Sequence, residues 1–264
     1  MKTRQIAVAK KENQLLAFVW AQSETKRPSG AVFATQPTSF GDSMRKVAVI
    51  CLALFMSSCS KEAEHGGKTV SQWRQGLKDA DAKTRLKSAN ALGALGAKAK
   101  SAVPDLMAAL QDADGQVRAK VATALWSIGA DAEEAVPALT AALKDKSAEV
   151  RLCAAGALAE IGPKARAAIP ALALALKDKD ADVRDQAAKS LGRFGADAKE
   201  AVTDMVVALK DPSPAVRVDV AYALAAIGPE AAPAIPALQD LLKETDGNIR
   251  GAAKHALKKI QAKE

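Results

Sequence analysis

Residues 145–177 read DKSAEVRLCAAGALAEIGPKARAAIPALALALK, and this stretch decides the fold. Its first half places apolar side chains at the three- and four-residue spacing of one helix face: Val150, Ala154, Leu158 and Ile161. Gly162 and Pro163 end that helix, because glycine suits a left-handed cap and proline cannot continue the hydrogen-bond ladder. The second half has the same spacing at Ile169, Leu172 and Leu176. The stretch therefore predicts a helical hairpin.

This hairpin pattern recurs along the chain with an interval of 33 residues and no insertion. One column of the repeat is arginine: Arg85, Arg118, Arg151, Arg184, Arg217 and Arg250. A second column is leucine: Leu92, Leu125, Leu158, Leu191, Leu224 and Leu257. A third is aspartate: Asp79, Asp112, Asp145, Asp178 and Asp211, which Glu244 continues. A residue that recurs in every unit performs the same structural task each time, so we interpret the aspartates as caps and the arginines as partners of loop acids.

A single hairpin cannot bury both of its faces, whereas stacked copies can. The sequence therefore predicts an all-α fold, an α-solenoid with a 33-residue period, over residues 69–262. The array is expected to contain a half-repeat, five full repeats and a final half-repeat. Its first half-repeat is a lone second helix near Val70, Trp73 and Leu77, and its last is a lone first helix over Asn248 to Ile260.

Each unit has the same order of short motifs: Asp, Val-Arg, Ala-Leu, Ile-Gly, Val-Pro-Ala-Leu and Leu-Lys. This order resembles HEAT-like repeats of the phycobilisome-lyase type. The resemblance covers residues 70–260. It implies a helical solenoid, and it implies little about activity, because the family includes adaptors, scaffolds, inhibitors and a few enzymes. A chromophore (bilin) lyase or accessory factor is one role that the resemblance implies, in the cytoplasm.

A different signal precedes the repeats. Arg45 and Lys46 are followed by ten apolar residues, 47–56, and then by two serines and Cys59. This is the layout of an export signal, and ten residues span only about 15 Å as a helix, too short for a bilayer. The Met-Ser-Ser-Cys sequence resembles the lipobox of bacterial lipoproteins, which implies that Cys59 carries a lipid.

These features predict the organisation of the first 68 residues. Residues 1–43 are interpreted as a mis-assigned upstream extension, with a disordered arm as the alternative, and residues 44–58 as a lipoprotein signal peptide. Residues 59–68 are expected to be the lipidated cysteine and a polar linker that reaches at most about 30 Å. The expected location is the bacterial cell envelope, on an outer membrane facing the periplasm.

The net charge of +8 does not by itself indicate a nucleic-acid partner. Residues 1–43 carry six basic and three acidic residues, and the predicted signal adds two basic ones. The 205 residues after Cys59 carry a net charge of only +3. We therefore expect no nucleic-acid binding.

The sequence offers no catalytic, cofactor or metal site. Asp178, Asp180 and Asp182 resemble the start of a calcium loop, but Val183 stands where that loop needs glycine. Cys153 occupies a column that is polar in other units, and we expect a partly exposed and inert thiol, with pairing to another molecule as the alternative. The expectations are no enzyme activity, no cofactor and no small-molecule substrate.

Binding of another protein is the better hypothesis, and the variable columns indicate where. On the second helices, which line the concave surface in solenoids of this type, one outward column is apolar in mid-array: Ala141, Leu174 and Val207. A lysine row lies beside it: Lys144, Lys177 and Lys210. Such a strip suits a partner segment with apolar and acidic residues. The alternative is that the lysines only complement the helix dipoles and keep the array soluble. Trp126 and Tyr222 on the first helices are further candidate anchors, unless they only cover neighbouring helices.

These observations lead to one functional hypothesis. We expect a non-enzymatic scaffold or adaptor for protein–protein interaction, tethered to the bacterial envelope by a lipid on Cys59.

Overall fold

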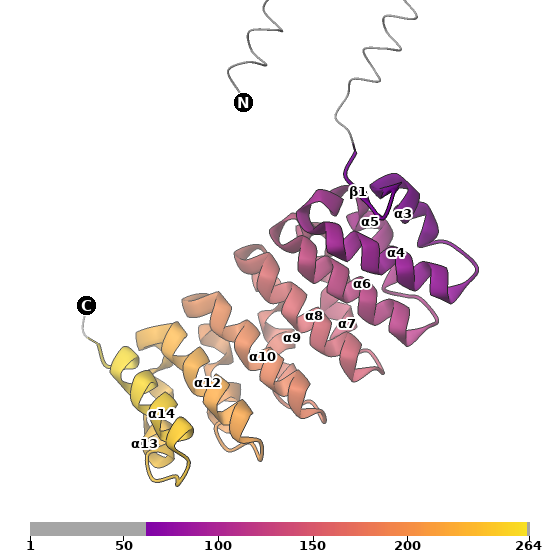
Figure 1. Cartoon of the computed structure of the whole chain (residues 1–264). Coiled ribbons are helices and arrows are strands. Elements are labelled where there is room, and N and C mark those ends of the chain that lie inside the picture. Colours follow the sequence, from indigo (N-terminus) through magenta and orange to yellow (C-terminus); the bar gives the residue numbers. More distant parts are fainter. Residues whose placement is uncertain (1–61, 263–264) are drawn as a thin grey trace, which may run out of the picture. The chain divides into compact units, whose positions relative to one another are not determined.

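The computed structural model describes residues 62–262. Residues 1–43, the predicted signal 44–58 and Cys59 lie outside the described part, so it does not bear on those predictions. The described chain begins with a small antiparallel hairpin, β1 (Glu64–His65) and β2 (Lys68–Thr69). Helices alone follow, and they form one row of stacked units (Figure 1).

Each full unit contains three elements. The first helices are 14 residues long: α4 (Ala82–Leu95), α6 (Gly115–Ile128), α8 (Ala148–Ile161), α10 (Ala181–Phe194), α12 (Pro214–Ile227) and α14 (Gly247–Ile260). The 3-10 segments are η1 (Gly96–Ala102), η2 (Gly129–Ala135), η3 (Gly162–Ala168), η4 (Gly195–Ala201) and η5 (Gly228–Ala234). The second helices are α3 (Val70–Gly76), α5 (Val103–Ala109), α7 (Val136–Ala142), α9 (Ile169–Ala175), α11 (Val202–Ala208) and α13 (Ile235–Leu241).

The predicted all-α solenoid is confirmed. The array starts with α3, a second helix without a first, and it ends with α14, a first helix without a second. The sequence prediction missed the seven-residue 3-10 segments between the two helices of each unit. Glycine opens each segment at positive φ, as at Gly162 with φ of 73°, a conformation that glycine adopts at little steric cost.

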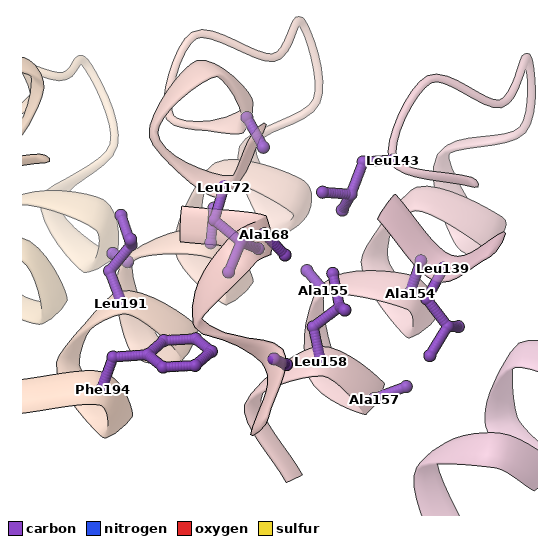
Figure 2. Close-up of a cluster of buried hydrophobic side chains, with 14 of the residues drawn as sticks. Leu139, Leu143, Ala154, Ala155, Ala157, Leu158, Ala168, Leu172, Leu191 and Phe194 are labelled. Atoms are coloured by element: carbon purple, nitrogen blue, oxygen red, sulfur yellow. The ribbon is translucent and has the colours of Figure 1, made fainter. Parts of the chain in front are cut away.

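The core lies between the two helix layers and is built from leucine and alanine. Leu158 of α8 and Leu172 of α9 are fully buried and lie in one cluster with Ala154, Ala157 and Phe194 (Figure 2). The first helices of neighbouring units approach closely, because a Cβ built at Gly93 would lie 3.2 Å from the Cα of Ala124. All buried apolar residues of the described part lie between residues 70 and 260, so the array completes its own core.

By length and composition alone, one stretch of this core could cross a membrane. The stretch Pro214–Leu241 is 28 residues long and contains an 18-residue window with a mean hydropathy of 1.2. It comprises α12, η5 and α13, which are separated at Gly228 with φ of 77°, and Val220, Leu224 and Leu238 are fully buried in the solenoid core.

A charged clamp joins each unit to the next. The Arg118 guanidinium donates two parallel hydrogen bonds to Asp145, with Nε–Oδ2 at 2.7 Å and Nη2–Oδ1 at 2.9 Å. Arg118 Nη1 also donates to the backbone carbonyl of Asp112 in its own loop, and Asp145 accepts the N–H of Ser147. The same arrangement is present three more times: Arg85–Asp112, Arg151–Asp178 and Arg184–Asp211.

The structural interpretation of the Asp and Arg columns is confirmed with one refinement. The aspartates accept backbone N–H groups in the loop, but the N-cap of the first helix lies two residues later, as at Asp114 and Asp180. The Arg85 guanidinium lowers the pKa of Asp112, and the Arg118 guanidinium lowers the pKa of Asp145. Bidentate geometry of this kind is the strongest form of the arginine–carboxylate pair.

The clamp fails at the last junction. Glu244 occupies the aspartate position there, and Arg217 Nε is buried without a hydrogen-bond partner among the described residues. Arg217 keeps only its bonds from Nη1 to the carbonyls of Asp211 and Pro212. Within the described residues no ion pair joins the Glu244 carboxylate to Arg217, and glutamate differs from the aspartate of the other clamps by one additional methylene.

We expect Glu244→Asp to complete the fifth clamp and to stabilise the protein. A buried donor without a partner costs about 1–3 kcal/mol, so the free energy of unfolding should rise by about 1 kcal/mol in a urea titration followed by circular dichroism. Asp178→Glu makes the opposite change at an intact clamp and should lower the free energy of unfolding by a similar amount. A Glu244→Asp variant that is no more stable than the parent would contradict this account of the clamp.

Candidate functional site: two exposed faces of the array

The second-helix face carries the apolar strip and the lysine row expected from the sequence. Here this name means Ala141 on α7, Leu174 on α9, Val207 on α11 and the three lysines that follow these helices: Lys144, Lys177 and Lys210. Leu174 is 61% exposed and Val207 is 60% exposed, and Ala141 is exposed as well. Exposed large apolar side chains are rare in the described part: besides Leu174 and Val207, only Tyr222 is exposed. The face is therefore an unpartnered apolar strip.

The three lysines differ in their neighbours. Lys177 Nζ lies 2.7 Å from Oδ1 of Asp204, which is in the first turn of the next second helix. The position of Asp204 is taken by Ala171 in the unit after Lys144, and by Ala237 in the unit after Lys210. Within residues 62–262 no carboxylate lies at ion-pair distance from Lys144 or Lys210. These two ammonium groups are free for a carboxylate from outside.

Grooves open between consecutive second helices. A groove of about 450 Å³ lies between the end of α5 and α7, and its lining includes Ala141, Lys144 and Asp145. A second groove, of about 260 Å³, lies between α7 and α9 and is lined by Lys144, Leu174 and Lys177 among others. The second helices pack mainly against the first helix that follows them and against the next 3-10 segment, and they have little contact with one another, which leaves this space between them. Lys144 thus reaches both grooves.

Trp126 has a packing role on the other side of the array. Its indole ring on α6 covers Gly156 on α8, since a Cβ built at Gly156 would lie 2.5 Å from Cζ3 of the ring. Trp126 is only half-buried, so one edge still faces solvent. Glycine at position 156 is what allows the ring to lie flat across the neighbouring helix.

Tyr222 lies in a row of polar side chains on the first helices. It is 49% exposed on α12, and its ring centroid lies 5.6 Å from that of His255 on α14. Lys189 occupies the same column on α10 and contacts Asp185 at 2.5 Å and Asp219 at 3.5 Å. Tyr222 therefore lies near a charged cluster on the first helices and is not part of the second-helix face.

The charged cluster contains a carboxyl pair that sequence reasoning missed. Asp185 on α10 and Asp219 on α12 face each other across the junction of two units, because their columns are adjacent there. Burial raises the pKa of Asp219 to about 6, and the neighbouring Asp185 carboxylate contributes to this shift. The residues equivalent to Asp185 and to Asp219 in most other units are uncharged or basic. The repeat pattern therefore did not predict a carboxyl pair.

Cys153 is buried, which corrects the expectation of partial exposure. Its side chain lies on α8 next to Thr123, whose hydroxyl donates to the sulfur at 3.4 Å. Burial raises the pKa of the Cys153 thiol, and a thiol with little thiolate is a weak nucleophile. Among the described residues no group of three or more His, Cys, Asp or Glu side chains could hold a metal ion.

Stacked hairpins of equal length, clamped through their loops, define the class of this protein as an α-solenoid repeat protein. HEAT repeats match residues 70–151, 103–180 and 169–258. The chain therefore belongs to the HEAT-repeat family. No match was found among curated proteins.

Solved structures share the fold. An engineered protein of the Northeast Structural Genomics Consortium is 27% identical with a TM-score of 0.59, over 73% of this chain and 96% of the other. A designed armadillo repeat protein in complex with the peptide (KR)4 is 21% identical with a TM-score of 0.63, over 74% and 100%. The complex of CpcE and CpcF of phycocyanin lyase from Nostoc sp. PCC7120 is 24% identical with a TM-score of 0.52, over 77% and 82%. At these identities the last two show the fold alone.

The carboxyl pair should make stability depend on pH. The folded protein holds the Asp219 proton up to about pH 6, above the ordinary range of an aspartate, so the free energy of unfolding falls as the pH rises from about 4 through about 6. Asp219→Asn removes the charge and should raise the free energy of unfolding by about 1 kcal/mol near neutral pH, with little change at about pH 4.

The matched control is Glu200→Gln, since Glu200 is exposed on η4 and forms no ion pair within the described residues. Urea titrations over a pH series should show a flatter profile for Asp219→Asn and the parent profile for Glu200→Gln. An Asp219→Asn profile with the parent's slope between about pH 4 and 6 would show that Asp219 titrates in its ordinary range.

Proposed function

We propose that this protein is a non-enzymatic scaffold that binds another protein through its second-helix face. The observation that carries the proposal is the exposed pair Leu174 and Val207, flanked by Lys144 and Lys210, which have no carboxylate partner in the described part. Desolvation of the two apolar side chains would supply affinity, and the two ammonium groups would select acidic residues. Designed armadillo repeat proteins of the same fold bind peptides, which supports an extended segment as the partner.

We further propose that the scaffold is anchored to the bacterial cell envelope by a lipid on Cys59, facing the periplasm from an outer membrane. The sequence supports this through the basic start, the ten apolar residues and the small residues before Cys59. Mass spectrometry of the protein extracted from native membranes should find a lipid-modified cysteine as the first residue. An unmodified N-terminus at Met1 would overturn the anchor.

A chromophore lyase-like or accessory role is the second candidate. It is supported by the fold shared with CpcE and CpcF of phycocyanin lyase, at 24% identity. Such a role belongs to the cytoplasm, so a cytosolic location of the native protein would favour it over the anchored scaffold.

Replacing Leu174 and Val207 together by aspartate should abolish partner binding. Each substitution puts a carboxylate where an apolar surface is required, and both positions face solvent, so helicity measured by circular dichroism should not change. The readout is crosslinking at the second-helix face: a photoreactive residue at Gln111, which is exposed in the groove between α5 and α7, should give a partner adduct in the parent and none in the double variant.

Ala167→Asp with Ala232→Asp is the matched control, because both alanines are exposed on the 3-10 segments η3 and η5. This control adds the same charge away from the face and should leave the adduct unchanged. An adduct that persists at the parent level in the Leu174 and Val207 double variant would refute the proposed face.

A further inference from the structure

The chain is folded from the first residue that the structure describes. The Glu62 carboxylate accepts hydrogen bonds from the N–H and the hydroxyl of Ser71, both at 2.7 Å. Val70 N–H donates to the Ala63 carbonyl at 3.1 Å, and Thr69 caps α3 with a full capping box. The stretch 59–68, expected to be a lipidated cysteine and polar linker, is therefore part of the folded array from residue 62 onward.

A tight turn holds this segment against the array. Gly66 and Gly67 both have positive φ, 57° and 73°, as a two-residue hairpin turn of type I′ requires. The Trp73 indole N–H donates to the His65 carbonyl at 3.1 Å, and Lys68 Nζ lies 4.8 Å from the Trp73 ring centroid. The cation–π contact fixes the position of the Lys68 ammonium group.

The folded start leaves little tether between Cys59 and the array. Three residue steps join Cys59 to Glu62, and an extended chain covers at most about 3.6 Å for each. A lipid on Cys59 would therefore hold Glu62, where the folded segment begins, within about 11 Å of the lipidated cysteine, instead of the 30 Å or so that a flexible linker would give.

A basic pocket lies at this end of the array (the indigo end in Figure 1). It measures about 500 Å³ and lies between the hairpin and α4, with His65, Lys68, Trp73, Lys87 and Asn90 in its lining. None of the residues that line it is acidic. Two ammonium groups and an amide suit a phosphate group, since lysine binds phosphate as a point charge and asparagine donates hydrogen bonds.

From these observations we propose that the pocket binds the phosphate headgroup of an anionic phospholipid and seats the array end-on at the membrane. The inference rests on the proposed lipid anchor, which brings the pocket to the headgroup region. Lys68 and Lys87 contact the phosphate, and Asn90 donates to one of its oxygens. The lipid on Cys59 supplies attachment, and the pocket supplies orientation.

The test uses the chain from residue 59 with Cys59→Ser, which contains the complete array and no lipid. Its binding to phosphatidylcholine vesicles with and without phosphatidylglycerol is measured by cosedimentation. We expect binding only with phosphatidylglycerol, and Lys68→Gln with Lys87→Gln should weaken it by about fivefold for each lysine removed. Lys254→Gln with Lys258→Gln removes the same charge from α14, at the other end of the array, and should retain parent binding.

Equal weakening by the two double variants would overturn the pocket in favour of general charge attraction, and so would the absence of phosphatidylglycerol-dependent binding. Binding that inorganic phosphate abolishes at matched phosphate concentration would overturn the lipid as the ligand, in favour of the free anion. Circular dichroism of each variant checks the fold. Because this chain carries no lipid, the result is independent of whether native Cys59 is modified, which mass spectrometry decides separately.

Discussion

The arginine–aspartate clamp between successive units is the constraint on which the rest of the structure depends. A solenoid has only nearest-neighbour contacts, so its shape is set by the geometry of one junction repeated along the row. Each clamp ties a guanidinium on one first helix to the carboxylate in the next loop, and to one or two backbone carbonyls of its own loop. Because four junctions have the same geometry, equivalent residues of successive units line up along the row. Where these residues are not buried by packing, they form the exposed faces.

Periodicity predicted the features that every unit shares. The leucine column is buried from Leu92 to Leu224 because these units need the same apolar contact, and the arginine column binds loop aspartates at four junctions because these need the same clamp. Features of single units were harder to predict. Cys153 was expected at a partly exposed position because Lys87, Lys120 and Gln186 share its column, yet it is buried beside Thr123. A column describes the average unit, whereas burial depends on the particular neighbours in the next one.

At the candidate site, too, periodicity predicted what the units share and not how single units differ. The sequence predicted correctly that Leu174 and Val207 face solvent, because helical spacing fixes the face of each residue. It could not show which lysines of the row are free, since that depends on the first turn of the following second helix. Asp204 engages Lys177, and alanine at the equivalent positions leaves Lys144 and Lys210 without a partner in the described part. Nor did it show the 3-10 segments, whose seven alanine-rich residues have no apolar period of their own.

The net charge of this protein does not show where it recognises a partner. Recognition depends on which charged side chains at each surface lack an ion-pair partner. The net charge of +8 comes mostly from residues before Cys59, and within the array four aspartates are engaged by the clamps and four others cap first helices. Attraction for anions therefore arises where cations form no ion pair within the described residues: at Lys68 and Lys87 of the hairpin pocket, and at Lys144 beside Leu174 on the second-helix face. These two places lie at one end of the row and along its side. An array seated on a membrane by its hairpin end would thus keep the whole second-helix face open to a protein partner, so anchoring and partner binding need not compete for the same surface.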